Sequence, residues 1–316
     1  MRSAAFVQLA LQKLSCSQKE LALKLGVSPT QITKWKNNEH MSMDMEQKFR
    51  DLIRIGDRDP QFVLWAGSTQ SSEKWELLIR FIAEIAHDTS ETGYITYPLT
   101  TESEILCWHT FHTLNQLGVT IPSPFPEELD MDYDDVSDEE WERIVSENSV
   151  SSLIYDIFTS LNDIYGFFAA YIHDVIYSEH MDEFDPFGPD IESCLMELAA
   201  CKVEMAPELA PHFGEFKRQT LKNYTRWLTR LKEKAFNLGV PLKAELLDLV
   251  YNSTDELSHK AEAESLGFNS SRLHPDIYMD ELLTGMRTIH QVLPAIMKKL
   301  GIEDEFELDV SELRNG

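Results

Sequence analysis

Residues 17–37 read SQKELALKLGVSPTQITKWKN, and this stretch carries the strongest structural pattern in the chain. Ser17 stands where a helix begins, and Glu20 three residues later completes the pattern of a capping box. Gly26 follows the apolar positions of that helix and suits the left-handed conformation at a helix end. Ser28 is placed to cap a second helix. The stretch therefore predicts two short helices joined by a tight turn.

The second helix has a good start and one apolar face. Pro29 occupies its first position, where a missing N–H costs nothing, and Gln31 fits a second capping box. Ile32 and Trp35 recur at helical spacing and predict the packed face, which makes Trp35 a packing residue rather than a base contact. The first half of the opposite face would protrude. A helix of this kind fits the major groove of DNA and reads base edges with its first residues.

This pattern resembles the helix-turn-helix of the Cro/CI-like (XRE) repressor family. The resemblance covers residues 1–56 and is carried by Gln18, Glu20-Leu21-Ala22, Gly26-Val27-Ser28, Gln31-Ile32, Trp35 and Asn37. It implies a compact unit of four or five helices that binds double-stranded operator DNA. The remainder of the chain shows no such resemblance.

The resemblance also implies which side chains touch DNA. It assigns base contacts to Thr30, Gln31, Thr33 and Lys34. It assigns phosphate contacts to Gln18 and Asn37, with Lys36 as a nearby positive charge. A lysine donates to guanine O6 and N7, and a threonine bonds a base or touches a thymine methyl group. Pro29 departs from the family, because it stands where members often read a base, so a narrower sequence readout is expected.

Helical patterns dominate the rest of the chain, so the predicted fold class is mainly α, with a large α-helical domain after the N-terminal unit. Beyond the first 55 residues, helices are expected over 73–87, 101–117, 149–177, 191–205, 213–238, 241–252, 254–266 and 274–300, and a short strand over 93–98. The expected division is a DNA-binding domain (1–56), a linker (57–71), an acidic domain for oligomerisation or sensing (72–302) and an acidic tail (303–316).

Charge is distributed unevenly along the 316 residues, whose net charge is −26. Residues 1–58 hold ten Lys or Arg against six Asp or Glu, a net of +4, which leaves −30 for residues 59–316. A polyanion such as DNA is therefore attracted to the first part and repelled by most of the second. The two parts are expected to have different tasks.

Two charged segments in the second part each allow two interpretations. Residues 127–142 hold ten acidic side chains and no basic one, which fits a solvated loop or a strip that mimics DNA or docks a partner. In residues 217–234, basic side chains recur every four positions at Arg218, Lys222, Arg226, Arg230 and Lys234. They fit an exposed helix face that balances nearby acids, or a surface for nucleic acid or an acidic partner.

Enzyme and metal patterns are sparse. No phosphate-binding loop, Gly-x-Ser-x-Gly elbow or His-Glu-x-x-His sequence occurs. Arg80 and His87 have a spacing seen in HEPN-type ribonucleases, but the pair is too short to decide. The Glu-x-x-His pairs ending at His87 and His259 are as frequent as chance allows, and His109 and His112 are interpreted as packed histidines. The sequence predicts no metal and no cofactor, and it gives no positive sign of an enzyme.

The chain lacks a membrane-length apolar run and an evident signal peptide, and its four cysteines contain no CxxC. A cytoplasmic location without membrane contact is expected. The predicted function is a DNA-binding transcription regulator, a repressor or autoregulator of bacterial or phage type, acting as a homodimer or higher homo-oligomer. Its helical part would sense a signal or a protein partner. The alternatives are a nuclease-like or toxin-like effector of a phage-defence or mobile-element system, and a pure protein-interaction module.

Overall fold

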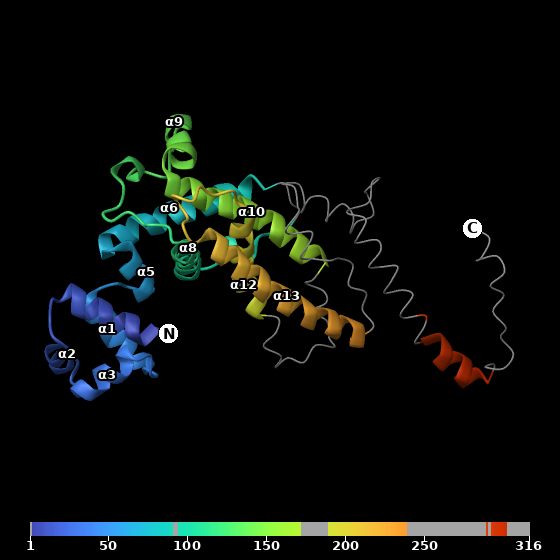
Figure 1. Ribbon diagram of the computed structural model, residues 1–316. Coiled ribbons are helices and arrows are strands. Elements are labelled where there is room, and N and C mark those ends of the chain that lie inside the picture. The colour runs from blue at the N-terminus through green and yellow to red at the C-terminus, as the bar shows by residue number, and fades with distance from the viewer. Residues whose placement is uncertain (1, 91–93, 172–188, 239–288, 290–291, 302–316) are drawn as a thin grey trace.

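The computed structural model describes residues 2–90, 94–171, 189–238, 289 and 292–301. Every regular element in these residues is helical, and no strand occurs among them. The predicted mainly α fold is confirmed for this part of the chain. Figure 1 shows a small N-terminal unit at one end of a longer helical body.

The N-terminal unit contains α1 (Arg2–Lys13), α2 (Gln18–Leu25), α3 (Pro29–Lys36) and α4 (Met43–Ile53). Helix α1 contacts the three others, and it also packs against α5 (Pro60–Ala66). The core of the unit is built around the fully buried side chains of Phe6, Leu21, Ile32 and Phe49. The rings of Phe6 and Phe49 lie 5.7 Å apart, which closes α1 against α4. Short helices are therefore held together by one small, dense core.

The segment 57–71, expected to be a linker, contains helix α5 (Pro60–Ala66) and the start of α6. Asp59 accepts hydrogen bonds from the amides of the first turn of α5, which explains why a Pro- and Asp-rich break in the pattern begins a helix. Helix α5 joins two cores. Val63 is buried in the N-terminal core, while Phe62 is buried in the core of the body. The division into domains stays a prediction.

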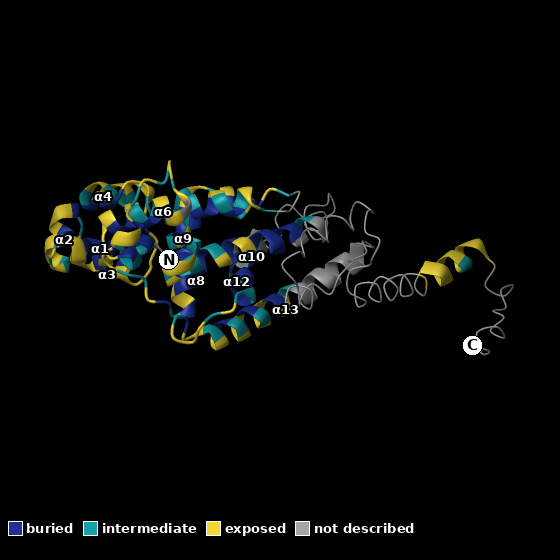
Figure 2. Cartoon of the chain, turned by 90° about the horizontal axis from the view of Figure 1, so that it is seen from above, coloured by how far each residue is buried: buried dark blue, intermediate teal, exposed yellow. Residues whose placement is uncertain are grey.

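The body consists mainly of α6 (Thr69–Asp88), α8 (Ser103–Leu117), α10 (Ser149–Tyr171), α12 (Pro189–Lys202) and α13 (Phe213–Leu238). Helix α10 packs against α6 and α12, and α13 packs against α12 and α8. The ring of Trp75 meets the rings of Phe111 and Phe125 edge-on at 5.5 and 4.9 Å, deep in the core. Figure 2 shows the buried residues concentrated where these helices face one another.

Four short elements connect the long helices: α7 (Tyr97–Thr100), η1 (Glu127–Leu129), α9 (Asp138–Glu142) and η2 (Arg143–Glu147). The strand expected near residues 93–98 is wrong for the described part of that segment. Helix α7 begins there, with Pro98 in its first turn. Proline fixes φ near the helical value and lacks a donor that the first turn does not need, so Pro98 fits the first turn of a helix better than the end of a strand.

The long helices expected from periodicity are found, with shifted ends. Helix α6 begins at Thr69 rather than residue 73, because Ser68 caps it by accepting a hydrogen bond from the Ser71 amide. Helix α10 begins at Ser149 as expected and is buried along most of its length. The helices expected over 241–252 and 254–266, most of 274–300 and the tail 303–316 lie outside the described residues. No helix that the structure describes is long and apolar enough to span a membrane.

Candidate nucleic-acid interface

The first helix of the interface, α2, is fixed by a complete capping box. The Ser17 hydroxyl accepts a hydrogen bond from the Glu20 amide, and the Glu20 carboxylate accepts one of 2.7 Å from the Ser17 amide. The backbone bond and a second bond from the Ser17 hydroxyl lower the pKa of Glu20. The carboxylate thus also stabilises the positive end of the helix dipole. The predicted cap is confirmed.

The turn after α2 depends on Gly26. This residue is left-handed, with φ of 70° and ψ of 32°. Its amide donates to the Leu23 carbonyl, and the Val27 amide donates to the Ala22 carbonyl at 2.9 Å. These two bonds form a Schellman motif, which satisfies the last carbonyls of α2 and reverses the chain. No atom lies within 4 Å of where a side chain would begin at Gly26, so backbone conformation alone demands glycine.

The second helix, α3, has the expected start and the expected packed face. The Ser28 hydroxyl accepts from the Gln31 amide at 3.2 Å, which is the half of the second capping box that forms among the described contacts. Ile32 is fully buried. Trp35 is 4% exposed, packs edge-on against Phe49 and donates from Nε1 to the His40 carbonyl. Trp35 is therefore a packing residue, as predicted.

The face of α3 opposite this core carries the four residues predicted to contact bases. Thr30, Thr33 and Lys34 are exposed and Gln31 is half-buried. The Thr33 hydroxyl donates to the Pro29 carbonyl at 3.2 Å, which leaves its methyl group and its acceptor lone pairs for another partner. The hydrogen-bonding side chains of Thr30, Thr33 and Lys34 thus project into solvent, while Ile32 and Trp35 on the other side of α3 are packed in the core. Such a surface can make base contacts in a major groove.

An acidic side chain that the helix-turn-helix pattern does not indicate lies beside Lys34. The Glu39 carboxylate is 3.8 Å from Lys34 Nζ, and both side chains are about half exposed. Backbone hydrogen bonds at the end of α3 hold Glu39 there, because its amide donates to the Lys34 carbonyl. The spacing of five residues between Lys34 and Glu39 does not by itself predict this contact, because the backbone between them is an irregular turn. An exposed pair of this kind is weak and separates easily.

The predicted phosphate contacts lie at the ends of the two helices. Gln18 is half-buried in the first turn of α2, and Lys36 and Asn37 are exposed at the end of α3. The Asn37 amide is occupied in closing α3, so only its side chain is available to a phosphate. Asn38 has a structural role instead, since its side chain accepts from the Ala4 amide and ties the turn to α1.

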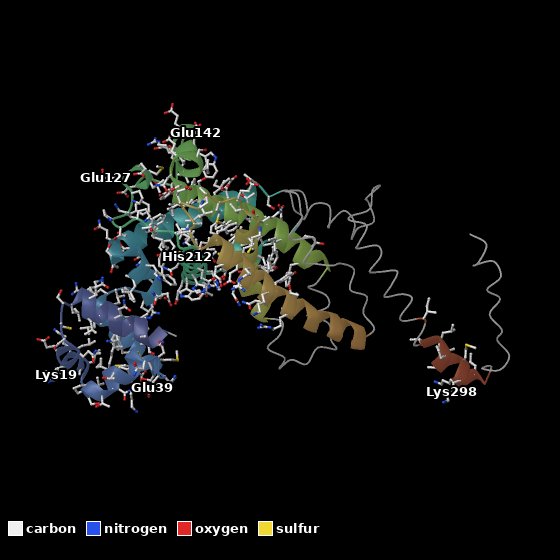
Figure 3. All side chains as sticks on the ribbon, viewed as in Figure 1. Lys19, Glu39, Glu127, Glu142, His212 and Lys298 are labelled. Carbon is white, nitrogen blue, oxygen red and sulfur yellow. The ribbon has the colours of Figure 1, made fainter. Side chains whose placement is uncertain are left out.

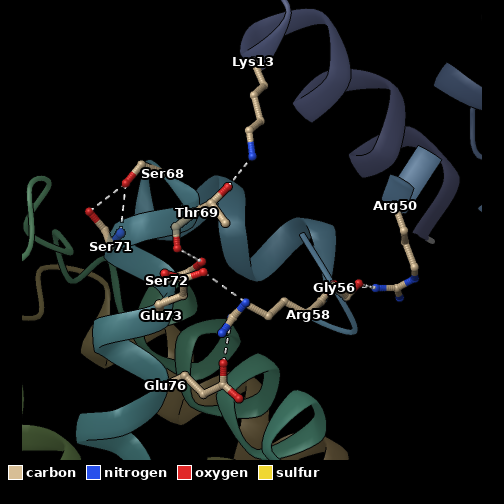
Figure 4. A network of polar contacts seen from close by, with 10 residues as sticks. All are labelled: Lys13, Arg50, Gly56, Arg58, Ser68, Thr69, Ser71, Ser72, Glu73 and Glu76. Atoms are coloured by element: carbon tan, nitrogen blue, oxygen red, sulfur yellow. Dashed lines mark hydrogen bonds and ion pairs between the residues drawn. The ribbon is translucent and has the colours of Figure 1, made fainter. Parts of the chain in front are cut away.

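Three of the ten basic residues of this region face the body, and Figure 4 shows their contacts. Arg50 donates to the carbonyls of Gly56 and Arg58, and Arg58 bonds Glu76 at 2.7 Å and approaches Glu73. Lys13 donates to Thr69 at the start of α6. Lys13 and Arg58 thus fasten the N-terminal unit to α6, and Arg50 lies 3.8 Å from the Glu104 carboxylate of the body, so these three side chains are occupied away from the DNA-facing helices. Composition alone counted them with the DNA-binding charges.

The acidic segment 127–142 lies apart from the N-terminal unit. Figure 3 shows Glu127 and Glu142 at the top, far from Lys19 and Glu39 on the N-terminal unit. Charges separated by more than about 8 Å are largely screened at physiological salt. The most acidic part of the chain therefore does not oppose an approach of DNA to α3.

The histidines expected to be packed are confirmed as such. His112 lies flat on Trp108, with ring centroids 4.6 Å apart, and also contacts Trp65. Burial, together with the neighbouring His112, lowers the pKa of His109, and burial lowers that of His112. Among the described residues, no group of three side chains is arranged to hold a metal ion.

Comparison with known proteins agrees with the geometry at the N terminus. Residues 7–43 match a helix-turn-helix family model, which confirms the resemblance inferred from residues 17–37. No curated protein and no solved structure matches the chain. The N-terminal unit is therefore similar to a helix-turn-helix, a match that supports DNA binding, and the family match does not extend to the body.

Proposed function

We propose that the protein is a sequence-specific transcription regulator that occupies a promoter through α3. The observation that carries this proposal is the exposed row of Thr30, Thr33 and Lys34 on a helix fixed by a cap, a left-handed glycine and a closed core. A surface held this rigidly loses little conformational entropy on binding. The family match at residues 7–43 supports the same function.

One helix-turn-helix makes few phosphate contacts, so useful affinity requires two. We therefore propose a homodimer on two half-sites about one helical turn of DNA apart. Repression would follow from blocking the promoter. The cytoplasm is the compartment in which such a protein would meet its operator.

The proposal is tested by DNA binding of the full chain to a fragment from upstream of its own gene. Fluorescence anisotropy at roughly 50 and 200 mM salt would separate electrostatic from specific binding. Lys34→Ala is expected to weaken cognate binding by about 1–3 kcal/mol and to reduce the preference over unrelated DNA. Lys48→Ala is the matched control, because Lys48 is an exposed lysine of the same unit on α4. Equal binding of cognate and unrelated DNA by the wild type would contradict the proposal.

Glu39 provides a second test of the same face. Glu39→Gln removes the partner of Lys34 and a negative charge beside the DNA, so tighter cognate binding is expected. In a Lys34→Ala background, Glu39→Gln should raise the operator affinity by less, because Glu39 and Lys34 interact with each other. An identical gain in both backgrounds would show that Glu39 acts on operator binding independently of Lys34.

The body is proposed to sense a signal or a partner and to pass it to α3 through the junction. A cavity of about 430 Å³ lies there, lined by Arg58 and Phe62 on one side and by Glu76, Glu104 and Cys107 on the other. An occupant would compete with the Arg58–Glu76 contact. Arg58→Ala breaks that contact without touching α3, so the folded variant should show altered operator affinity. If the operator affinity of the Arg58→Ala variant is unchanged, the junction does not transmit a signal from the body to α3.

A second candidate function, a nuclease-like or toxin-like effector, is favoured by one observation. Arg80, Glu84 and His87 of α6 line a hollow of about 280 Å³ together with Thr100 and Thr101. Histidine can transfer protons and arginine can stabilise a phosphoryl group's charge. If the body is such an effector, expression should be toxic, and Arg80→Ala or His87→Ala should relieve toxicity while Arg54→Ala should not. Harmless expression of the wild-type chain would rule this candidate out.

A further inference from the structure

Helix α13 presents a basic face that points away from its own core. Phe216, Thr220 and Tyr224 are each 5% exposed and face the body. Arg218 and Lys222 each follow a member of this buried row by two positions, which is about 200° around a helix, and both are exposed. Arg226 continues the same row and is also exposed. The basic face of α13 is thus a row of three cations with a spacing of about 6 Å.

Among the residues that the structure describes, the acids of the same chain do not cover this face. The only ion pair that the structure gives this row, within the described residues, is the bond from Arg218 to Glu215 on the same helix. Both of these side chains are more than 60% exposed, so the pair costs little to break. One expectation for this face was that it balances nearby acids, and the richest acidic stretch of the chain is residues 127–142. The structure places those acids elsewhere, against α6 and α10.

The acidic strip, residues 127–142, is a fixed surface rather than a loose loop. Tyr133 and Trp141 pack against Phe81 of α6, and Trp141 also meets Tyr155 of α10 edge-on. Leu129 is fully buried beneath the strip. The exposed acids for which no ion pair occurs in the described structure are Glu127, Glu128, Asp132, Asp134, Asp135, Glu139 and Glu142. The protein therefore displays a rigid negative surface and a rigid positive surface that do not meet within one chain.

We propose that the basic face of α13 binds the acidic strip of a second copy of this chain. Opposite potentials on two preformed surfaces steer association and fix its register. In a two-fold dimer the contact forms twice, strip to helix and helix to strip, which closes the assembly. Net repulsion between two acidic chains is screened at physiological salt, whereas the contacting charges lie within the screening distance. This proposal names the interface of the proposed dimer and rests on the proposed function only for its effect at an operator.

The test uses two charge-reversed full-length variants with complementary changes. Lys222→Glu with Arg226→Glu makes the helix face acidic, and Asp134→Lys with Asp135→Lys makes the strip basic. In a homodimer of either variant both contacts bring like charges together. In an equimolar mixture of the two, each acidic surface meets a basic one, so both contacts are restored. Lys24→Glu with Lys48→Glu is the control for the net charge of the α13 variant, since it makes the same change in charge at two lysines exposed on the N-terminal unit.

Sedimentation equilibrium at ~50, ~150 and ~500 mM salt is the measurement. Each variant alone should dissociate with a constant on the order of tenfold or more above that of the control, and the mixture should recover wild-type association. Wild-type association should weaken at high salt. A monomeric wild type, variants that associate like the control, or a mixture that stays dissociated would each overturn the proposal.

DNA binding of the same samples separates this proposal from the proposed function. Loss of operator affinity in the α13 variant, with its association unchanged, would assign the basic face to nucleic acid and overturn the dimer contact. Conversely, a chain that dimerises through these surfaces but binds no operator would leave the contact standing and reject the regulator.

Discussion

The N-terminal unit and the body are both helical, yet their folds are specified in different ways. Helices α2 and α3 are eight residues long and depend on defined ends, with Ser17 and Ser28 at their starts and Gly26 between them. The body uses helices of up to 26 residues, and its stability depends on which apolar face meets which. The caps and the glycine that define the ends of a short helix also determine which of its residues are exposed. Periodicity fixes only which side of a long helix is buried.

Helix α5 offers the most sensitive test of whether the two regions fold separately, because its side chains belong to both cores. A substitution there is expected to change the free energy of unfolding more than any other change considered below. Phe62→Ala removes a fully buried ring that meets Phe111 at 4.8 Å, and a loss of about 3–5 kcal/mol in the free energy of unfolding is expected. If α5 couples the two regions, denaturant unfolding followed by circular dichroism should remain one shifted transition. Two unfolding transitions, of which only the one that belongs to the body is shifted, would show that the regions unfold independently.

Val63→Ala is the companion change on the other side of α5, since Val63 is fully buried in the N-terminal core. It removes less volume and should shift the same transition by a smaller amount.

Gly26 tests the claim that local conformation fixes the N-terminal unit. Gly26→Ala forces a residue with a β-carbon into the left-handed region, with no steric clash to add to the cost. A loss of about 1–2 kcal/mol is expected. Operator affinity measured well below the melting temperature should survive in the folded fraction. Gly214→Ala in helix α13 is the matched change, and because that site is also open and lacks a positive φ, it should be neutral or stabilising. Equal destabilisation by both changes would contradict the argument.

The two complete capping boxes allow a matched comparison of the regions. Ser17 and Glu20 begin α2, and Ser137 and Glu140 begin α9 in the acidic strip, with the same three hydrogen bonds. Ser17→Ala and Ser137→Ala should each cost about 1 kcal/mol in thermal or denaturant unfolding. Because α2 belongs to the helix-turn-helix and α9 does not, only Ser17→Ala should also weaken operator binding. A binding loss in Ser137→Ala would contradict this separation.

The smallest expected effect concerns pH and the half-buried histidines of the body. Burial lowers the pKa of both His109 and His112 below the ordinary value of 6.5. The unfolded chain therefore binds more protons than the folded one just below pH 6.5, so stability should fall as the pH drops through that range. His112→Gln should flatten this part of the stability curve. A slope unchanged from wild type would show that His112 does not contribute.

The acid limb of the same curve has another origin. The hydrogen bonds from Ser17 lower the pKa of Glu20 and those from Ser137 lower that of Glu140, each from an ordinary value of 4.5. These contributions are present above that value and are lost as the pH falls through the folded-state pKa values. A histidine substitution should leave this limb in place.

By itself, the sequence determined the helix-turn-helix, because caps, a left-handed glycine and apolar spacing act within a few residues of one another. Thr30, Thr33 and Lys34 could be placed on its exposed face for the same reason. Their DNA contacts remain predictions.

Only the tertiary structure decided the partners of charged and polar groups far apart in the chain. Composition counted Arg50 and Arg58 with the DNA-binding charges, yet both lie in the junction with the body. It could not show that Glu39 reaches Lys34, that α5 spans two cores, or that the acidic strip and the α13 face lie apart. Such contacts depend on how helices pack, and periodicity carries no information about which helix a given face meets.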